Sequence, residues 1–130
     1  MRRRSLIAIA AATAIAFASG PARAKDETFL VFFQLWSALI DPAGEDVIKA
    51  AATVAKANPT AVIDVRGYAS TDGSRQANLF ISLARAQLVS DSLMKQGIDA
   101  ARIKRVGEGE VEFLDNPQAN RRVDIVIRVP

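Results

Sequence analysis

The spacing of apolar residues divides the chain into strands and helices. Residues 28–35 (TFLVFFQL) form a nearly continuous run of aromatic and branched side chains, which predicts a well-covered strand. Apolar and polar side chains alternate with a period of two at residues 61–66 and again at 121–129, and this pattern predicts two further strands. Another short strand is expected at residues 103–108.

Two segments with helical spacing separate these strands. The first helix is predicted to begin at Asp41-Pro42, because Asp caps free N–H groups and Pro suits the first turn. It is predicted to end at Asn58-Pro59, since the residue before a proline avoids helical geometry. The second helix is expected over residues 74–96 and is closed by the glycine that follows. The core positions expected are Val47, Ala51, Val54 and Ala55, then Leu79, Leu83, Ala86, Val89 and Leu93.

The order strand, helix, strand, helix, strand, strand predicts one α/β domain. We expect a two-layer βαβαββ sandwich, with two helices packed on one face of a small mixed sheet. The 130 residues suffice for one domain of this kind but not for two.

Residues 1–24 are predicted to be a secretory signal peptide that lies outside this domain. Three arginines at positions 2–4 precede an apolar run at residues 5–17, and Ala22-Arg23-Ala24 fits a cleavage site. The alternative is a membrane anchor, but the apolar run is shorter than the ~20 residues that a spanning helix needs. We therefore expect a mature domain at residues 25–130, without a transmembrane segment, in the periplasm.

Charge and composition exclude several functions. Removing the four arginines of the predicted signal from the 17 basic residues leaves 13, against 14 acidic residues. The mature chain therefore lacks the basic excess of a nucleic-acid-binding protein. The chain contains no Cys and no His, so disulfides, thiolate zinc sites and Cys or His catalysis are excluded. We expect no cofactor and no metal site, and a protein that is not an enzyme.

The polar segment at residues 67–74 (GYASTDGS) is the candidate binding element. A turn that leads into a long helix presents free N–H groups and a partial positive charge, which suits a carboxylate. Asn78 and Arg85 are seven residues apart, so they share a face of the second helix. The turn and these two side chains could form a polar groove. The alternative for Arg85 is an ordinary exposed charge.

Five segments resemble, in the same order, motifs of the OmpA C-terminal-like family of peptidoglycan-binding periplasmic domains. They lie within residues 29–129 and are VFFQLWSALIDPAG, GYASTDGS, NLFISLARAQLVSDSLMKQGIDAARI, VGEGE and NRRVDIVI. The resemblance implies the same βαβαββ fold and a non-covalent ligand, the diaminopimelate of the peptidoglycan stem peptide. In the family, an Asp of the turn binds the ammonium of this zwitterion and an Arg of the second helix binds its carboxylate.

The resemblance implies five binding residues in this chain. The helix Arg falls on Arg85, the helix Asn on Asn78, and the arginines of NRRV on Arg121 and Arg122, of which Arg121 is the predicted binding residue. The family Asp falls on Ser70, a neutral hydrogen-bond acceptor. Asp72 could restore the anion by pointing inward, or it could be a turn or cap residue. The predicted site is therefore Ser70, Asp72, Asn78, Arg85 and Arg121.

Two functions remain open at this point. The first is peptidoglycan binding, for which we expect Asp72 to face Arg85 across a groove. The second is a protein-interaction module that has lost the ligand and binds an envelope protein, with Asp72 in solvent and the groove closed. Trp36 is a candidate contact for such a partner, although we expect its burial against the first helix.

Overall fold

The computed structural model describes residues 26–111 and 116–130. They contain a four-stranded sheet in the order β1-β4-β2-β3, built from β1 (Glu27–Phe32), β2 (Val62–Ala69), β3 (Ile103–Glu110) and β4 (Arg122–Arg128). Strand β4 is antiparallel to both β1 and β2, whereas β2 and β3 are parallel. The predicted signal peptide lies outside the described residues.

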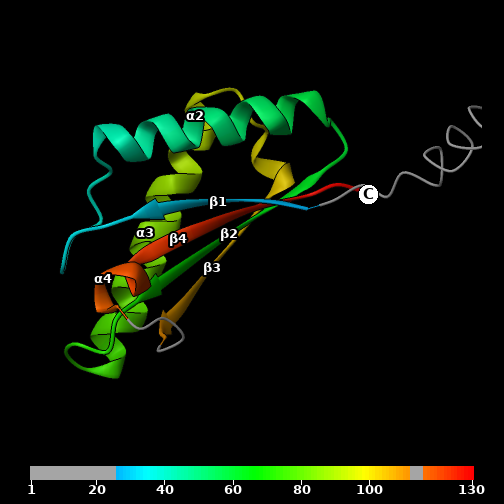
Figure 1. The fold of residues 1–130 in the computed structure, drawn as a ribbon. Coiled ribbons are helices and arrows are strands. Elements are labelled where there is room, and N and C mark those ends of the chain that lie inside the picture. Colours follow the sequence, from blue (N-terminus) through cyan, green and yellow to red (C-terminus); the bar gives the residue numbers. More distant parts are fainter. Residues whose placement is uncertain (1–25, 112–115) are drawn as a thin grey trace, which may run out of the picture.

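Two long helices cover one face of this sheet (Figure 1). Helix α2 (Pro42–Ala57) packs over β1 and β4, and α3 (Arg75–Lys95) packs over β2 and β3. A short 3-10 helix (Ala100–Arg102) precedes β3, and the four-residue α4 (Pro117–Asn120) precedes β4. The predicted two-layer α/β sandwich with a mixed sheet is confirmed.

Local signals place the helix ends where the sequence predicts them. Asp41 caps α2, with its carboxylate 2.8 Å from the backbone N of Gly44, and Asn58 follows the last residue of that helix. Ser74 caps α3 by accepting a hydrogen bond from the backbone N of Ala77. Gly97 follows this helix with a φ of 99°, a left-handed conformation that favours glycine.

The hydrophobic core lies between the helices and the sheet. Alternation in β4 is confirmed, since Val123, Ile125 and Ile127 are all buried there. The other core side chains come from β1, α2, β2, α3 and the connections next to them: Val31, Phe33, Ile48, Ala51, Ala52, Ala55, Ala61, Ile63, Val65, Ala86, Val89, Leu93 and Ile98.

The prediction that Leu79 and Leu83 face the core is wrong. Their exposed fractions are 50% and 47%. Helix α3 lies so close to β2 that a Cβ atom on Gly67 would come 1.9 Å from the carbonyl oxygen of Ser82. The part of α3 over this contact is therefore occupied by small or polar side chains, and the leucines lie beside it.

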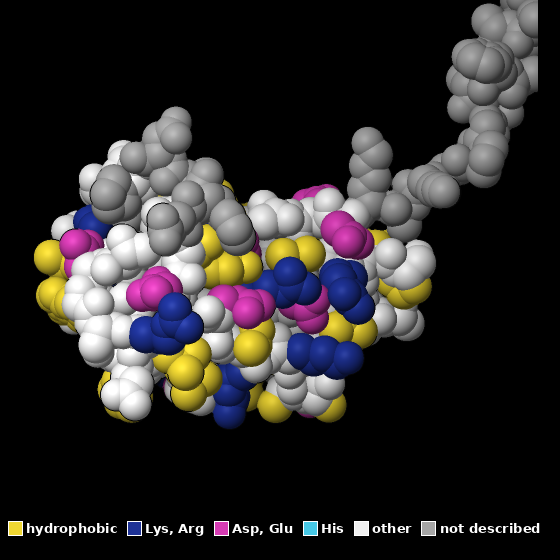
Figure 2. Space-filling view, turned by 90° about the horizontal axis from the view of Figure 1, so that it is seen from below, with side chains coloured by type: hydrophobic (Ala, Val, Ile, Leu, Met, Phe, Trp, Pro, Cys, Tyr) yellow, Lys and Arg dark blue, Asp and Glu magenta, His cyan; other side chains and the backbone are white. Residues whose placement is uncertain are grey.

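The opposite face of the sheet is open and charged. Asp64 of β2 forms ion pairs with Arg66 at 3.2 Å and with Arg128 at 3.3 Å, and Arg122 forms one with Asp124 at 2.7 Å. Figure 2 shows the molecule from the side opposite α2, where basic and acidic side chains are interspersed. No helix in the described parts of the chain is long and apolar enough to span a membrane.

Candidate functional site

A small pocket lies where β2 ends and α3 begins. Four of the five predicted binding residues line it, namely Ser70, Asn78, Arg85 and Arg121. Its other lining residues are Leu35, Trp36, Ala69 and Ile81. The volume is about 10 Å³, which leaves room for about one water molecule. Residues predicted from distant parts of the sequence are therefore brought together, in a pocket that is nearly closed.

Strand β2 extends further than predicted, and this extension sets the position of the turn. The strand runs to Ala69 instead of ending at residue 66, so the turn begins at Ser70. Because Ser70 directly follows the strand, its side chain is buried at the wall of the pocket. The first strand, by contrast, ends at Phe32 rather than at residue 35, and the chain then turns through Trp36.

Arg85 forms the buried base of the site. Its exposed fraction is 1%, and it is the largest fully buried side chain among the described residues. Its Nε donates to the carbonyl oxygen of Ser37 at 2.8 Å, Nη1 to that of Tyr68 at 3.0 Å, and Nη2 to that of Gln34 at 3.0 Å. The guanidinium also lies over the ring of Phe33, 5.2 Å from the ring centre. The alternative of an ordinary exposed arginine is thus excluded.

The charge of Arg85 has no carboxylate partner within 4 Å among the described residues. Burial lowers the pKa of Arg85 to about 10, and the nearby positive charge of Arg121 lowers it in the same direction. Arg85 therefore remains charged at neutral pH at an energetic cost. Each terminal nitrogen keeps one N–H beyond its carbonyl bond, and two such groups can bind a carboxylate bidentately.

Ser70 and Asp72 form a hydrogen-bonded pair at the rim of this pocket. The Ser70 hydroxyl donates to Oδ2 of Asp72 at 2.8 Å. Asp72 itself is exposed and does not line the pocket. Asp72 therefore does not face Arg85 across a groove, the arrangement expected for peptidoglycan binding, but lies in solvent, the arrangement expected for the interaction module. Its carboxylate nevertheless remains joined to the wall of the pocket through Ser70.

Asn78 is held by a residue that the sequence did not single out for the site. Its exposed fraction is 1%, and its amide nitrogen donates to Oε2 of Glu110 at 2.9 Å. Arg75 lies on the other side of the same carboxylate, with Nε at 3.9 Å from Oε1. Glu110 is the last residue of the VGEGE segment, so the resemblance of this segment to a family motif could have drawn attention to it. This network fixes the first turns of α3 beside the end of β3.

The neighbouring arginines Arg121 and Arg122 separate to opposite faces of the sheet. Arg121 lines the pocket, and its Nε donates to the carbonyl oxygen of Phe33 at 3.2 Å. Arg122 lies on the open face, where it pairs with Asp124 and covers the ring of Tyr68 at 4.5 Å from the ring centre. Of these two arginines, only Arg121 can contact a ligand group in the pocket.

Trp36 lines the pocket and packs on the turn beside it. The prediction that it is buried against the first helix is wrong, because its exposed fraction is 48%. Its backbone φ is 56°, a strained value for a bulky side chain. Its ring packs on Gly73, where a Cβ atom would come 2.3 Å from Cη2. Glycine at position 73 makes room for the indole on the predicted binding turn.

The chemistry available at this site is recognition of charged groups. The pocket is lined by two arginines, Arg85 and Arg121, and by the ring of Trp36. The hydroxyl of Ser70 also lines it and is hydrogen-bonded to the exposed carboxylate of Asp72. Within residues 26–111 and 116–130, no cluster of three or more side chains is suited to hold a metal ion.

Comparisons with known proteins match most of this chain. The profile described as the OmpA family covers residues 32–124. The probable lipoprotein YiaD of Escherichia coli (strain K12) is 33% identical over 103 residues, which cover 75% of this chain and 47% of that protein. The peptidoglycan-binding protein ArfA of Mycobacterium tuberculosis (strain ATCC 25618 / H37Rv) is 33% identical over 92 residues, 66% of this chain and 28% of its own length. The chain thus spans less than half the length of these curated relatives.

A solved structure has the same fold. The OmpA-like domain of FopA1 from Francisella tularensis subsp. tularensis SCHU S4 superposes with a TM-score of 0.73 and is 25% identical in sequence. The superposition covers 85% of this chain and 78% of that domain.

Proposed function

Because the chain belongs to the OmpA family, we propose that it is a non-catalytic domain that binds peptidoglycan in the pocket at the end of β2. A relative with 33% identity is named as a peptidoglycan-binding protein, which supports this class of ligand. The ligand group is the diaminopimelate of the stem peptide, whose free end carries one carboxylate and one ammonium.

The buried guanidinium of Arg85 is the observation that supports this function most directly. A fully buried cation without a carboxylate partner among the described residues is unfavourable unless a ligand supplies the anion. The three carbonyl bonds hold the guanidinium in one orientation, so a carboxylate meets a preorganised fork. Arg121 adds a second positive charge at the same pocket.

The ammonium of the ligand would lie at the Ser70 side of the pocket. Ser70 offers a hydroxyl oxygen, and the negative charge of Asp72 lies directly behind it through the 2.8 Å hydrogen bond. Donation to Asp72 makes the Ser70 oxygen a better acceptor, because linked hydrogen bonds polarise one another. The pair thus supplies part of the anionic character that a carboxylate at position 70 would provide.

Export completes the proposal. We place the signal peptide at residues 1–24 and the mature domain at residues 25–130, located in the periplasm beside the cell wall. Such a domain needs neither a cofactor nor a metal for this role.

A protein-interaction module is the second candidate function, and two observations favour it. Asp72 is exposed, and the pocket is almost closed. The same region exposes Leu35, Trp36 and Leu39, which could contact an envelope protein.

Retention on purified peptidoglycan sacculi tests the primary proposal. The wild-type protein should cosediment with sacculi, and Arg85→Lys should weaken retention about tenfold, because lysine loses the bidentate contact. Arg102→Lys is the matched control, because Arg102 also donates hydrogen bonds to three backbone carbonyls but does not line the pocket. Circular dichroism would verify that both variants are folded.

Absence of wild-type retention would contradict peptidoglycan binding and leave the interaction module. Equal weakening by Arg85→Lys and Arg102→Lys would show that Arg85 does not contact the ligand. Soluble fragments released from the sacculi during incubation would contradict the non-catalytic assignment.

A further inference from the structure

Trp36 has an unusual position for an exposed aromatic residue. It is half exposed, its backbone is in the left-handed region at a φ of 56°, and its ring packs on the turn that holds Ser70 and Asp72. A hydrophobic side chain in a strained conformation persists only where its surroundings impose it, and such positions concentrate at ligand-binding sites. These three features give Trp36 a role that core packing does not explain.

Arg85 holds the backbone on both sides of Trp36. Its Nη2 binds the carbonyl of Gln34 and its Nε binds the carbonyl of Ser37, so the guanidinium holds the loop on both sides of Trp36. A third loop bond runs from the backbone N of Ser37 to the carbonyl of Gln34 at 3.1 Å. The residue expected to bind the ligand carboxylate therefore also holds the backbone that carries the indole in the wall of the same pocket.

The pocket must open before a ligand group can enter it, and Trp36 is part of the wall that surrounds the space. A volume of about 10 Å³ holds no group larger than water. Four of the residues that line the pocket lie outside the helices and strands, namely Leu35, Trp36, Ser70 and Arg121. A carboxylate can reach Arg85 only if part of this wall moves. Because Trp36 and Arg85 line the same pocket, a group that enters it lies close to the indole.

The ammonium of the ligand needs more than Ser70 and Asp72 provide. Ser70 is neutral, and Asp72 lies in solvent, where its attraction is weakened by water and salt. The face of an indole is the best aromatic partner for a cation, and it keeps this property at a site from which water is excluded.

We propose that Trp36 is a ligand-contacting residue of this pocket, whose indole moves off Gly73 and binds the ammonium end of the diamino acid by a cation–π contact. This inference rests on the proposed peptidoglycan function, and it names a recognition element for the end of the ligand that lacks a carboxylate partner at position 70. Trp36 thereby becomes a specificity determinant for a free amine.

Intrinsic fluorescence reports on this residue alone, because Trp36 is the only tryptophan in the chain. The protein expressed from the full chain would be titrated with a stem tripeptide that ends in meso-diaminopimelate. Binding should change the intensity and the wavelength of the Trp36 emission, and both changes should saturate as the peptide concentration rises. The affinity from fluorescence should agree with that from calorimetry.

Substitutions at position 36 separate cation–π contact from simple apolar contact. Trp36→Phe should retain affinity within about threefold, whereas Trp36→Leu should lose about five- to thirtyfold, the range of a cation–π contact. Phe80→Ala is the control, since Phe80 is an exposed aromatic of α3 that does not line the pocket. A tripeptide with an acetylated diaminopimelate amine should bind wild type and Trp36→Leu equally well, because its diaminopimelate carries no ammonium.

The outcomes distinguish the two proposals. Binding by wild type that is unchanged or tighter in Trp36→Leu would overturn the role of Trp36 and leave peptidoglycan binding intact. Equal losses in Trp36→Phe and Trp36→Leu, or a loss that persists with the acetylated peptide, would also overturn it. Failure of wild type to bind either the tripeptide or sacculi would overturn the peptidoglycan function and this inference together.

Discussion

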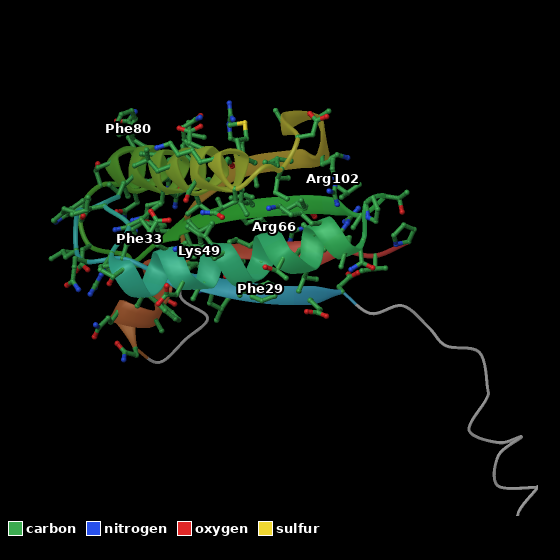
Figure 3. All side chains as sticks on the ribbon, turned by 90° about the horizontal axis from the view of Figure 1, so that it is seen from above. Phe29, Phe33, Lys49, Arg66, Phe80 and Arg102 are labelled. Atoms are coloured by element: carbon green, nitrogen blue, oxygen red, sulfur yellow. The ribbon has the colours of Figure 1, made fainter. Side chains whose placement is uncertain are left out.

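Two arginines bind backbone carbonyls at opposite ends of the sheet. Arg85 binds those of Gln34, Ser37 and Tyr68. Arg102 binds those of Ala55, Asn58 and Ala61, at distances of 2.8 to 3.1 Å. Figure 3 shows the separation, with Arg102 at one end of the molecule and Phe33, which packs under Arg85, at the other.

The surroundings of the two guanidinium groups differ. Ala55 and Asn58 belong to the C-terminal end of α2, where free carbonyls and the helix dipole favour a cation. Arg102 is partly exposed, so water completes its solvation. Arg85 is buried among loop and strand carbonyls, and burial lowers its pKa. Hydrogen bonds to backbone carbonyls are common to both arginines and therefore do not identify a ligand site. What distinguishes Arg85 is that its charge is buried and lines a pocket.

The largest expected effect concerns stability at these two positions. Arg85→Ala should lower the free energy of unfolding by about 4 kcal/mol, because three carbonyls lose their donors and the largest buried side chain leaves a cavity. Arg102→Ala should cost about 2 kcal/mol, since water can reach the freed carbonyls. Urea unfolding followed by circular dichroism measures both values.

A greater loss in Arg102→Ala than in Arg85→Ala would contradict this difference between the two ends. The slope of unfolding free energy against urea concentration should stay the same in all three proteins, because a changed slope would indicate a change in the unfolded state or an intermediate.

A smaller effect is expected from moving the anion at the pocket end. Ser70→Asp combined with Asp72→Asn should tighten tripeptide binding about tenfold, because a charge-assisted hydrogen bond is roughly twice as strong as a neutral one. Ser70→Asp alone should gain less, since Ser70 Oγ and Asp72 Oδ2 are 2.8 Å apart and two carboxylates there would repel. Calorimetric titration of the three proteins compares the affinities.

Unchanged affinity in the double variant would place the ammonium elsewhere than at position 70. Asp72→Asn alone is the control: it should weaken binding about threefold or less, because Asp72 acts only through Ser70 and from solvent.

Local sequence signals were sufficient for the order of the long helices and strands and for the helix ends, but not for the ends of β1 and β2. The helix ends at Asp41, Ser74 and Gly97 depend on residues that are close in the sequence. The alternation of buried and exposed positions in β4 can likewise be recognised from the residues of that strand alone. The exposure of Leu79 could not be predicted in the same way. It depends on how closely α3 approaches the glycines of β2 and β3, which is a property of the packed pair.

The candidate site also contains residues that the sequence predicted and features that it did not. Arg85 and Asn78 were found because helical spacing and the family motifs place them on one face, and Arg121 and Ser70 were found through the motifs. The outward direction of Asp72 depends on the Ser70 hydrogen bond, and the position of Trp36 depends on Arg85, 49 residues later in the chain. The first contact is local but is not periodic, and the contacts of Arg85 join distant parts of the chain, so neither leaves a periodic pattern in the sequence.

The smallest expected effect concerns Tyr68, which joins the two faces of the sheet at the pocket end. Its carbonyl accepts from Arg85 on the helix side, while its ring lies under Arg122 on the open face. Burial raises the pKa of the Tyr68 phenol, and the carboxylates of Asp124 and Glu108 raise it further. As the only tyrosine, Tyr68 can be titrated through the near-ultraviolet absorbance of the folded protein.

The folded state holds the Tyr68 proton more tightly than the unfolded state, which loses it near pH 10. This contribution to stability is complete below about pH 10 and is lost as the pH rises through the pKa of the folded protein. Asp124→Asn should lower the pKa of Tyr68, and Arg122→Gln should raise it, because the positive charge of Arg122 opposes the shift. Arg102→Gln should leave this pKa unchanged, since that arginine lies at the other end of the sheet. A shift in Arg102→Gln as large as that in Arg122→Gln would contradict the independence of the two ends.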